Sequence, residues 1–157
     1  LLHELAHKVV AQRYGYWAEF RADPQMLVIA VVSGAVGFLF AAPGAVRIYS
    51  YGNREIKKSE SGIISVAGPV TNLLLFGVFL VISLVAGSFG MPILAQVSFF
   101  GMFINAFLAA FNMIPFGPLD GRSVMDWNRL VFGIVFLISA ALAIMTMTSF
   151  NISQVVR

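Results

Sequence analysis

Three long stretches without a charged side chain constrain this chain more than any other feature. They cover residues 24–46, 61–119 and 130–156. About 20 helical residues cross a hydrocarbon layer roughly 30 Å thick, so apolar stretches of about 18 residues or more are typical of membrane spans. A helix of a soluble core would need a polar face, and these stretches have none. The sequence therefore predicts an all-α integral membrane protein that folds as a polytopic bundle of transmembrane helices.

Glycine, proline and polar clusters divide the chain into its expected elements. We expect helices at 1–13, 62–88, 93–113 and 130–148, and a short strand at 45–51. Residues 19–24 are polar and are expected to form a turn. The chain has 157 residues, enough for one domain and too few for two, and it contains no repeat or low-complexity linker. A single membrane-embedded domain over residues 1–157 is expected.

The charge pattern narrows the classes of partner. The net charge is +3, but the basic residues lie in loops beside the apolar stretches. They do not form the stripe of basic and aromatic residues that is typical of nucleic-acid binding. Lys and Arg beside a span indicate a cytoplasmic loop. The chain has no cysteine, which excludes disulfides and thiolate chemistry. The lipid bilayer is therefore the expected partner, and nucleic acid is not.

A short motif near the start of the chain contains residue types that can bind a metal ion and act as a general base. Residues 3–7 read His-Glu-Leu-Ala-His, and positions i and i+4 of a helix share a face, so both imidazoles can reach one metal ion. Glu4 can then act as a general base on a metal-bound water. This HExxH pattern often occurs by chance in soluble proteins. In an apolar helix a charged residue costs about 2.5–3.5 kcal/mol, so the setting here favours a metal site.

A catalytic zinc site normally has three protein ligands and one open position, so a third ligand is needed. Asp120 is the candidate, because it ends the uncharged stretch 61–119 and follows a helix broken by Pro115 and Pro118. An ordinary Asp-Gly turn at the membrane surface is the alternative interpretation. Three rival carboxylates have charged neighbours and are expected to be solvated. These are Glu55, Glu60 and Asp126.

Two further motifs give the chain a resemblance to a known family. Residues 67–72 read Ala-Gly-Pro-Val-Thr-Asn, and residues 112–121 read Asn-Met-Ile-Pro-Phe-Gly-Pro-Leu-Asp-Gly. Together with HExxH, and in the same order, they resemble the motifs of the site-2 protease family of intramembrane zinc metalloproteases. The last motif matches the family's NxxPxxPLDG signature and is far more specific than HExxH. The resemblance covers nearly the whole chain.

The resemblance implies a role for each matching residue. It implies that His3, His7 and Asp120 bind one Zn²⁺ per chain and that Glu4 is the general base. The implied activity is hydrolysis of peptide bonds in transmembrane protein substrates, as in regulated intramembrane proteolysis. The sequence gives no prediction for the oligomeric state. Two other functions remain open from the residues alone. One is a catalytically inactive membrane scaffold, and the other is a metal-binding or metal-transport protein.

Further residues have weaker implied roles. Asn112 lies where the family has an asparagine that orients the substrate or stabilises the oxyanion, and Asn72 matches a second family asparagine. Both amides could instead join helices by hydrogen bonds. Ile48, Tyr49 and Ser50 lie where the family has a short membrane-associated sheet. An exposed strand edge there could bind the substrate as an added strand.

The chain also departs from the family pattern. The helix that precedes HExxH and the usual first span have no counterpart here, so the N-terminal part of the family fold is expected to be missing. The helices expected at 62–88 and 93–113 would cross the membrane in opposite directions, which leaves residues 43–61 and Asp120 on the same side. One ion can join the two histidines to Asp120 only if residues 24–42 re-enter or lie in the interface. The basic loops then predict a multi-pass protein of a prokaryotic cell membrane with its active site near the cytoplasmic side.

Overall fold

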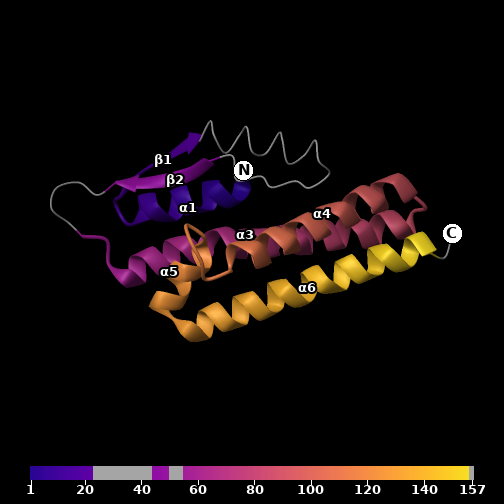
Figure 1. The fold of residues 1–157 in the computed structure, drawn as a ribbon. Helices are drawn as coiled ribbons and strands as arrows, with labels where there is room; N and C mark the ends of the chain where they lie inside the picture. Colours follow the sequence, from indigo (N-terminus) through magenta and orange to yellow (C-terminus); the bar gives the residue numbers. More distant parts are fainter. Residues whose placement is uncertain (23–43, 50–54, 156–157) are drawn as a thin grey trace.

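The structure is a computed structural model that describes residues 1–22, 44–49 and 55–155. Its elements follow the chain in the order shown in Figure 1. They are α1 (Leu2–Arg13), β1 (Trp17–Ala22), β2 (Gly44–Tyr49), α3 (Lys58–Ser88), α4 (Pro92–Asn112), α5 (Asp120–Trp127) and α6 (Arg129–Val155).

Three of these helices are long and apolar enough to cross a membrane, by length and composition, within the described residues. They are α3, α4 and the part of α6 from Arg129 to Ser149. The 31 residues of α3 correspond to about 46 Å of helix at 1.5 Å per residue. α3 packs along α4, and α4 packs against α6 (Figure 1). Gly90, with a φ of +65°, lies in the tight turn that reverses the chain between α3 and α4.

The N-terminal elements form a layer on the first half of α3. β1 and β2 pair antiparallel, with Trp17 opposite Tyr49. α1 lies between this two-stranded sheet and α3 (Figure 1). A buried cluster holds the three parts together, because Ala11 of α1, Ala18 of β1 and Ile64 of α3 pack with Tyr16. This packing turns one face of α1 toward α3.

The short helix α5 forms where the proline-rich segment ends. α4 stops at Asn112, and Gly117 adopts a φ of +62° in the turn that follows. α5 then begins at Asp120 and packs against α3 and α6. Gly121 lies against the backbone carbonyl of Met113, so closely that a side chain at this position has no room. This contact fixes the start of α5, and with it Asp120, against the end of α4.

Most of the predicted elements are present, with shifted ends. The helices predicted at 62–88 and 93–113 are α3 and α4, and the predicted strand 45–51 is β2. The turn predicted for residues 19–24 is wrong for its described part, because residues 19–22 belong to β1 and bond to β2. The predicted re-entrant segment 24–42 lies outside the described residues.

One predicted environment is also wrong. Glu60 is buried, with 8% of its surface exposed, instead of solvated. Its Oε2 accepts a hydrogen bond from the hydroxyl of Tyr16 and another from the backbone N–H of Lys57 at the start of α3. The hydroxyl of Tyr16 replaces hydrogen bonds that the Glu60 carboxylate would otherwise make to water. The charged neighbours of Glu60 in the sequence do not reveal this distant partner. Glu55 and Asp126 are exposed, as expected.

Candidate metal centre

Two histidines of α1 face α3 from the same side of their helix. His3 and His7 are four residues apart, and 9% and 7% of their surfaces are exposed. Their ring centroids lie 4.7 Å apart with the planes at 84° to each other. The i, i+4 spacing therefore brings both imidazoles to one place, beneath the sheet and against α3.

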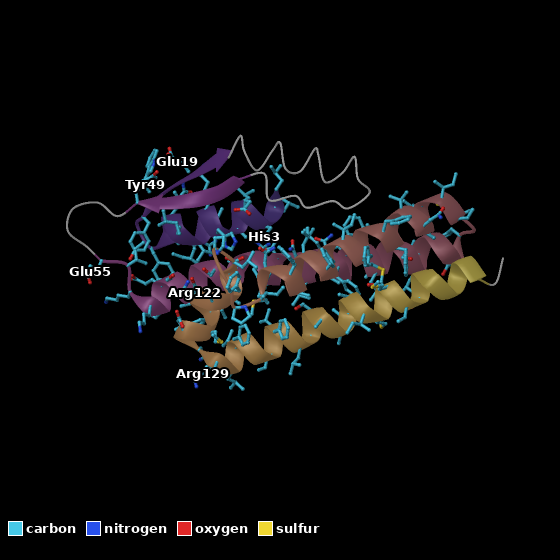
Figure 2. All side chains as sticks on the ribbon, viewed as in Figure 1. His3, Glu19, Tyr49, Glu55, Arg122 and Arg129 are labelled. Carbon is cyan, nitrogen blue, oxygen red and sulfur yellow. The ribbon has the colours of Figure 1, made fainter. Side chains whose placement is uncertain are left out.

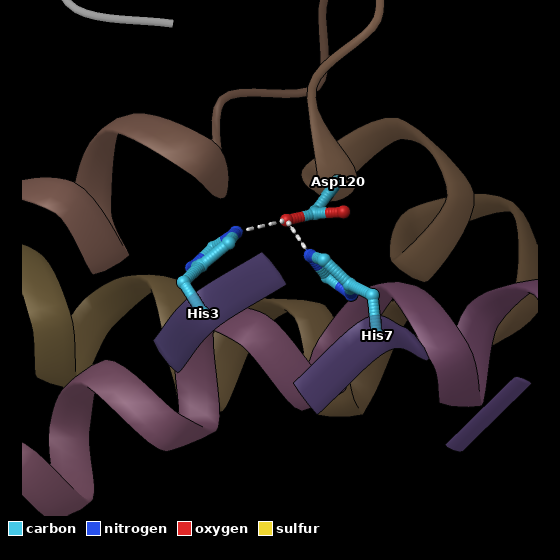
Figure 3. Close-up of side chains that lie close together, drawn as sticks. All are labelled: His3, His7 and Asp120. Atoms are coloured by element: carbon cyan, nitrogen blue, oxygen red, sulfur yellow. Dashed lines mark hydrogen bonds and ion pairs between the residues drawn. The ribbon is translucent and has the colours of Figure 1, made fainter. Parts of the chain in front are cut away.

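Asp120 reaches this place from the other end of the chain. Its Oδ2 lies 3.1 Å from Nε2 of His3 and 3.3 Å from Nε2 of His7 (Figure 3). The side chain of Asp120 is 16% exposed, so all three groups are largely withdrawn from water. One ligand atom from each residue lies within 4.8 Å of the other two. Figure 2 places His3 where α1 faces the long helices.

The second nitrogen of each imidazole also has a partner, and both partners come from α3. Nδ1 of His7 donates to the carbonyl of Ile64 at 2.7 Å. Nδ1 of His3 lies 3.1 Å from Nδ2 of Asn72. Partners of this kind hold a metal-binding imidazole in a fixed orientation and leave Nε2 directed at the ion.

Gly68 of α3 provides the space between the two imidazoles. A Cβ at this position would lie 2.5 Å from Nε2 of His3 and 2.5 Å from Nε2 of His7. Because a ligand atom lies about 2.0–2.1 Å from a zinc ion, such a Cβ would fall close to the place of an ion shared by both nitrogens. Glycine costs a helix about 1 kcal/mol relative to alanine. The glycine at position 68 leaves a space between the two imidazoles that any side chain would fill, and we call this space the cradle.

Hydrogen bonds and charge pair the carboxylate of Asp120 with the imidazoles of His3 and His7. Burial by itself raises the pKa of the Asp120 carboxyl, but hydrogen bonds from His3 and His7 and the charges of these imidazoles outweigh it and hold that pKa below its usual value. Burial by itself lowers the pKa of His7. The hydrogen bond and charge of Asp120, together with the Ile64 carbonyl and the charge of Glu4, outweigh burial and raise the pKa of His7 above its usual value. A metal ion would replace this proton-mediated pairing and release a proton.

Two of the three separations between ligand atoms have the length expected around a zinc ion. Ligand atoms around a tetrahedral ion with bonds of about 2.0 Å are separated by about 3.3 Å. The two separations from Asp120 to the histidines, 3.1 and 3.3 Å, match this value. Two imidazole nitrogens and one carboxylate oxygen are a common donor set of catalytic zinc sites, with the fourth position open.

The other predicted site residues lie around this centre or apart from it. Glu4 is half-buried on α1, and its charge contributes to the raised pKa of His7. The amide of Asn112 donates to the carbonyl of Leu108 in its own helix at 2.9 Å. Ile48 packs toward the cluster beneath the sheet, whereas Tyr49 is exposed. Ser50 lies outside the described residues.

Sequence reasoning missed two groups that shape the centre. One is Gly68, which belongs to the motif at residues 67–72 and precedes Pro69 inside an otherwise continuous helix, but for which no role was predicted. The other is the carbonyl of Ile64, and no side-chain pattern can predict that partner of His7 because every residue has a carbonyl.

Comparison with known proteins finds two relatives among curated sequences. A protein of Methanocaldococcus jannaschii named "Putative zinc metalloprotease MJ0611" is 42% identical over 140 residues, which cover 87% of this chain and 70% of the relative. A protein of Bacillus subtilis named "Putative zinc metalloprotease YwhC" is 34% identical over 142 residues, covering 80% of this chain and 63% of the relative. No family model and no solved structure matches the chain.

Proposed function

Because the chain belongs to the same zinc metalloprotease family as these two relatives, we propose that it is a zinc-dependent endopeptidase that hydrolyses peptide bonds of membrane-spanning proteins. The observation that carries the proposal is the convergence of His3, His7 and Asp120 on the cradle at Gly68. The membership in the site-2 protease family that the three motifs imply is part of the same proposal.

Each residue of the centre has a distinct role in the proposed reaction. His3, His7 and Asp120 would hold the ion, which when bound supplies a Lewis acid that activates water and polarises the scissile carbonyl. Glu4 accepts the proton of the attacking water and returns it to the leaving amine. Asn112 orients the substrate or donates a hydrogen bond to the developing oxyanion.

The proposed substrate is a membrane-spanning segment, because the centre lies against α3, one of the three described helices that are long and apolar enough to cross a bilayer. A peptide in an intact helix has its carbonyls in hydrogen bonds and must unwind before hydrolysis. The two-stranded sheet lies over α1, and within the described residues its outer edges pair with no third strand, so an extended segment could add there. We assign Ile48 and Tyr49 of β2 to this binding edge.

The proposed orientation places the centre near the cytoplasmic face of a multi-pass protein in a prokaryotic membrane. Basic residues lie at the end of the long helices next to α5. Lys58 begins α3 at this end. Arg129 begins α6 there (Figure 2). Arg122 lies on α5 at the same end (Figure 2). The turn at 89–91, at the opposite end, has no charge. Basic residues beside spans favour the cytoplasmic side.

Removal of metal from the purified protein in detergent tests the proposal. We expect cleavage of a test substrate with a single membrane-spanning segment, loss of cleavage after treatment with 1,10-phenanthroline, and recovery when zinc is added back after the chelator is removed. A soluble peptide with the same scissile sequence should be cleaved less well, because it lacks the apolar segment that positions it. Cleavage that survives complete metal removal would contradict the metalloprotease assignment. Preference for the soluble peptide would contradict the membrane-spanning substrate.

A further inference from the structure

The side chain of Asn72 has a position that helix packing alone does not require. It lies on α3 one turn after Gly68, and only 2% of its surface is exposed. Its amide faces Nδ1 of His3 at 3.1 Å, on the side of the ring opposite to Asp120. An amide in such a place can either donate through Nδ2 or accept through Oδ1, depending on how it is turned.

The partner of His7 has no such freedom. Nδ1 of His7 faces the carbonyl of Ile64, which can only accept a hydrogen bond. Nδ1 of His7 therefore carries a proton, which is the arrangement that lets Nε2 of a neutral ring bind a metal ion. His7 needs no rearrangement at Nδ1 to become a ligand.

His3 has an amide in the corresponding place. As a zinc ligand, Nε2 of His3 must present its lone pair, and the proton of the neutral ring then resides on Nδ1. Nδ1 then needs an acceptor, and the amide of Asn72, whose side-chain nitrogen lies 3.1 Å away, supplies one when it is turned to present Oδ1.

We propose that Asn72 is the positioning residue of His3 and that its Oδ1 accepts the Nδ1–H of His3 when His3 binds zinc. This inference rests on the proposed zinc site and adds to it a residue that acts through His3. A carboxylate at position 72 would also accept this hydrogen bond, and an aliphatic side chain would not.

The tautomer of His3 reports directly on the proposal. The chain has two histidines, so the ring nitrogens of ¹⁵N-histidine-labelled protein in detergent micelles give few signals, and a variant lacking His7 assigns them. We expect His3 of the zinc-loaded wild type to carry its proton on Nδ1. His7 should carry its proton on Nδ1 as well. A zinc-loaded His3 ring with its proton on Nε2, which would make Nδ1 the zinc ligand, would overturn the role of Asn72.

Zinc affinity separates positioning from general packing. Loss of a hydrogen-bond partner of a metal ligand typically weakens metal affinity by about 10- to 100-fold, and we expect a loss of this size in Asn72→Leu. Asn72→Asp keeps an acceptor opposite Nδ1 and should bind zinc about as tightly as the wild type. Asn105→Leu is the matched control, because Asn105 is a buried amide that donates within its own helix, to the carbonyl of Gly101. Its zinc affinity should be unchanged.

The possible outcomes are distinct. Wild-type affinity in Asn72→Leu, or an equal loss in Asn72→Asp and Asn72→Leu, would overturn the role of Asn72 while leaving the zinc site in place. If Asn72→Leu does not fold, the comparison of Asn72→Asp with wild type and the tautomer of His3 still decide the question. Absence of zinc binding in the wild type itself would instead remove the proposed function.

Discussion

Replacement of Glu4 by glutamine should abolish peptide cleavage and leave zinc binding intact. Glutamine has nearly the shape of glutamate, but it cannot accept the proton of the attacking water. General acid–base groups typically contribute about 10²- to 10⁴-fold to a reaction rate, so a loss in this range is expected. Glu4 follows His3 on α1 and is not one of the three converging ligand groups, so the ion should stay bound. Initial rates on the membrane-spanning test substrate, measured beside zinc content, check both parts.

Glu55→Gln is the matched control for this variant. Glu55 is an exposed carboxylate before α3, and its replacement removes the same charge without changing the centre. Its cleavage rate should equal that of the wild type. If Glu4→Gln cleaves as fast as Glu55→Gln, the general-base role of Glu4 is wrong, and the assignment of the chain as an enzyme with this mechanism must be rejected.

Replacement of Gly68 by alanine should remove zinc while preserving the fold. The added methyl group would lie 2.5 Å from Nε2 of both His3 and His7, so the imidazoles must swing away from their shared point. Both are side chains on α1, and they can move without unfolding α3. Alanine favours a helix over glycine by about 1 kcal/mol, which offsets part of the cost of this movement. Chelator competition for zinc affinity and thermal unfolding of the metal-free protein measure the two effects separately.

A second glycine of α3 provides the comparison for Gly68→Ala. A Cβ at Gly77 would meet nothing within 4 Å, so Gly77→Ala gains the same helix propensity without entering the centre. It should bind zinc like the wild type and be slightly more stable. Equal zinc affinity in Gly68→Ala and Gly77→Ala would show that the space at Gly68 is not needed for the ion.

The long helices could be predicted because their cause is local. Each apolar stretch is typical of a membrane span wherever it occurs, and prolines and glycines mark its ends. The strand β1 was not predicted, because Glu19, Arg21 and Asp23 with Pro24 were interpreted as a polar turn. Residues 19–22 become a strand by pairing with β2, more than 20 residues later in the sequence. Glu60 was misjudged for a similar reason, because its partner Tyr16 is 44 positions away.

The residues of the candidate centre also differ in whether local sequence could predict them. The shared face of His3 and His7 follows from helical spacing, whereas Asp120 stood out among the carboxylates only by its setting and by the resemblance of residues 112–121 to a known motif. Asn72 was marked by its motif, but its contact with His3 depends on how α1 packs on α3. Sequence patterns report on helix faces, and the packing of one helix against another decides which faces meet.

Zinc content, measured by elemental analysis of the purified wild type beside Asp120→Ala, tests the central claim most directly. Asp120 joins α5 to two imidazoles 117 and 113 positions earlier in the chain, and its removal leaves two protein ligands where a catalytic zinc site needs three. We predict one zinc per wild-type chain and far less in Asp120→Ala at the same helical content. Equal zinc in the two proteins would contradict the shared site of His3, His7 and Asp120.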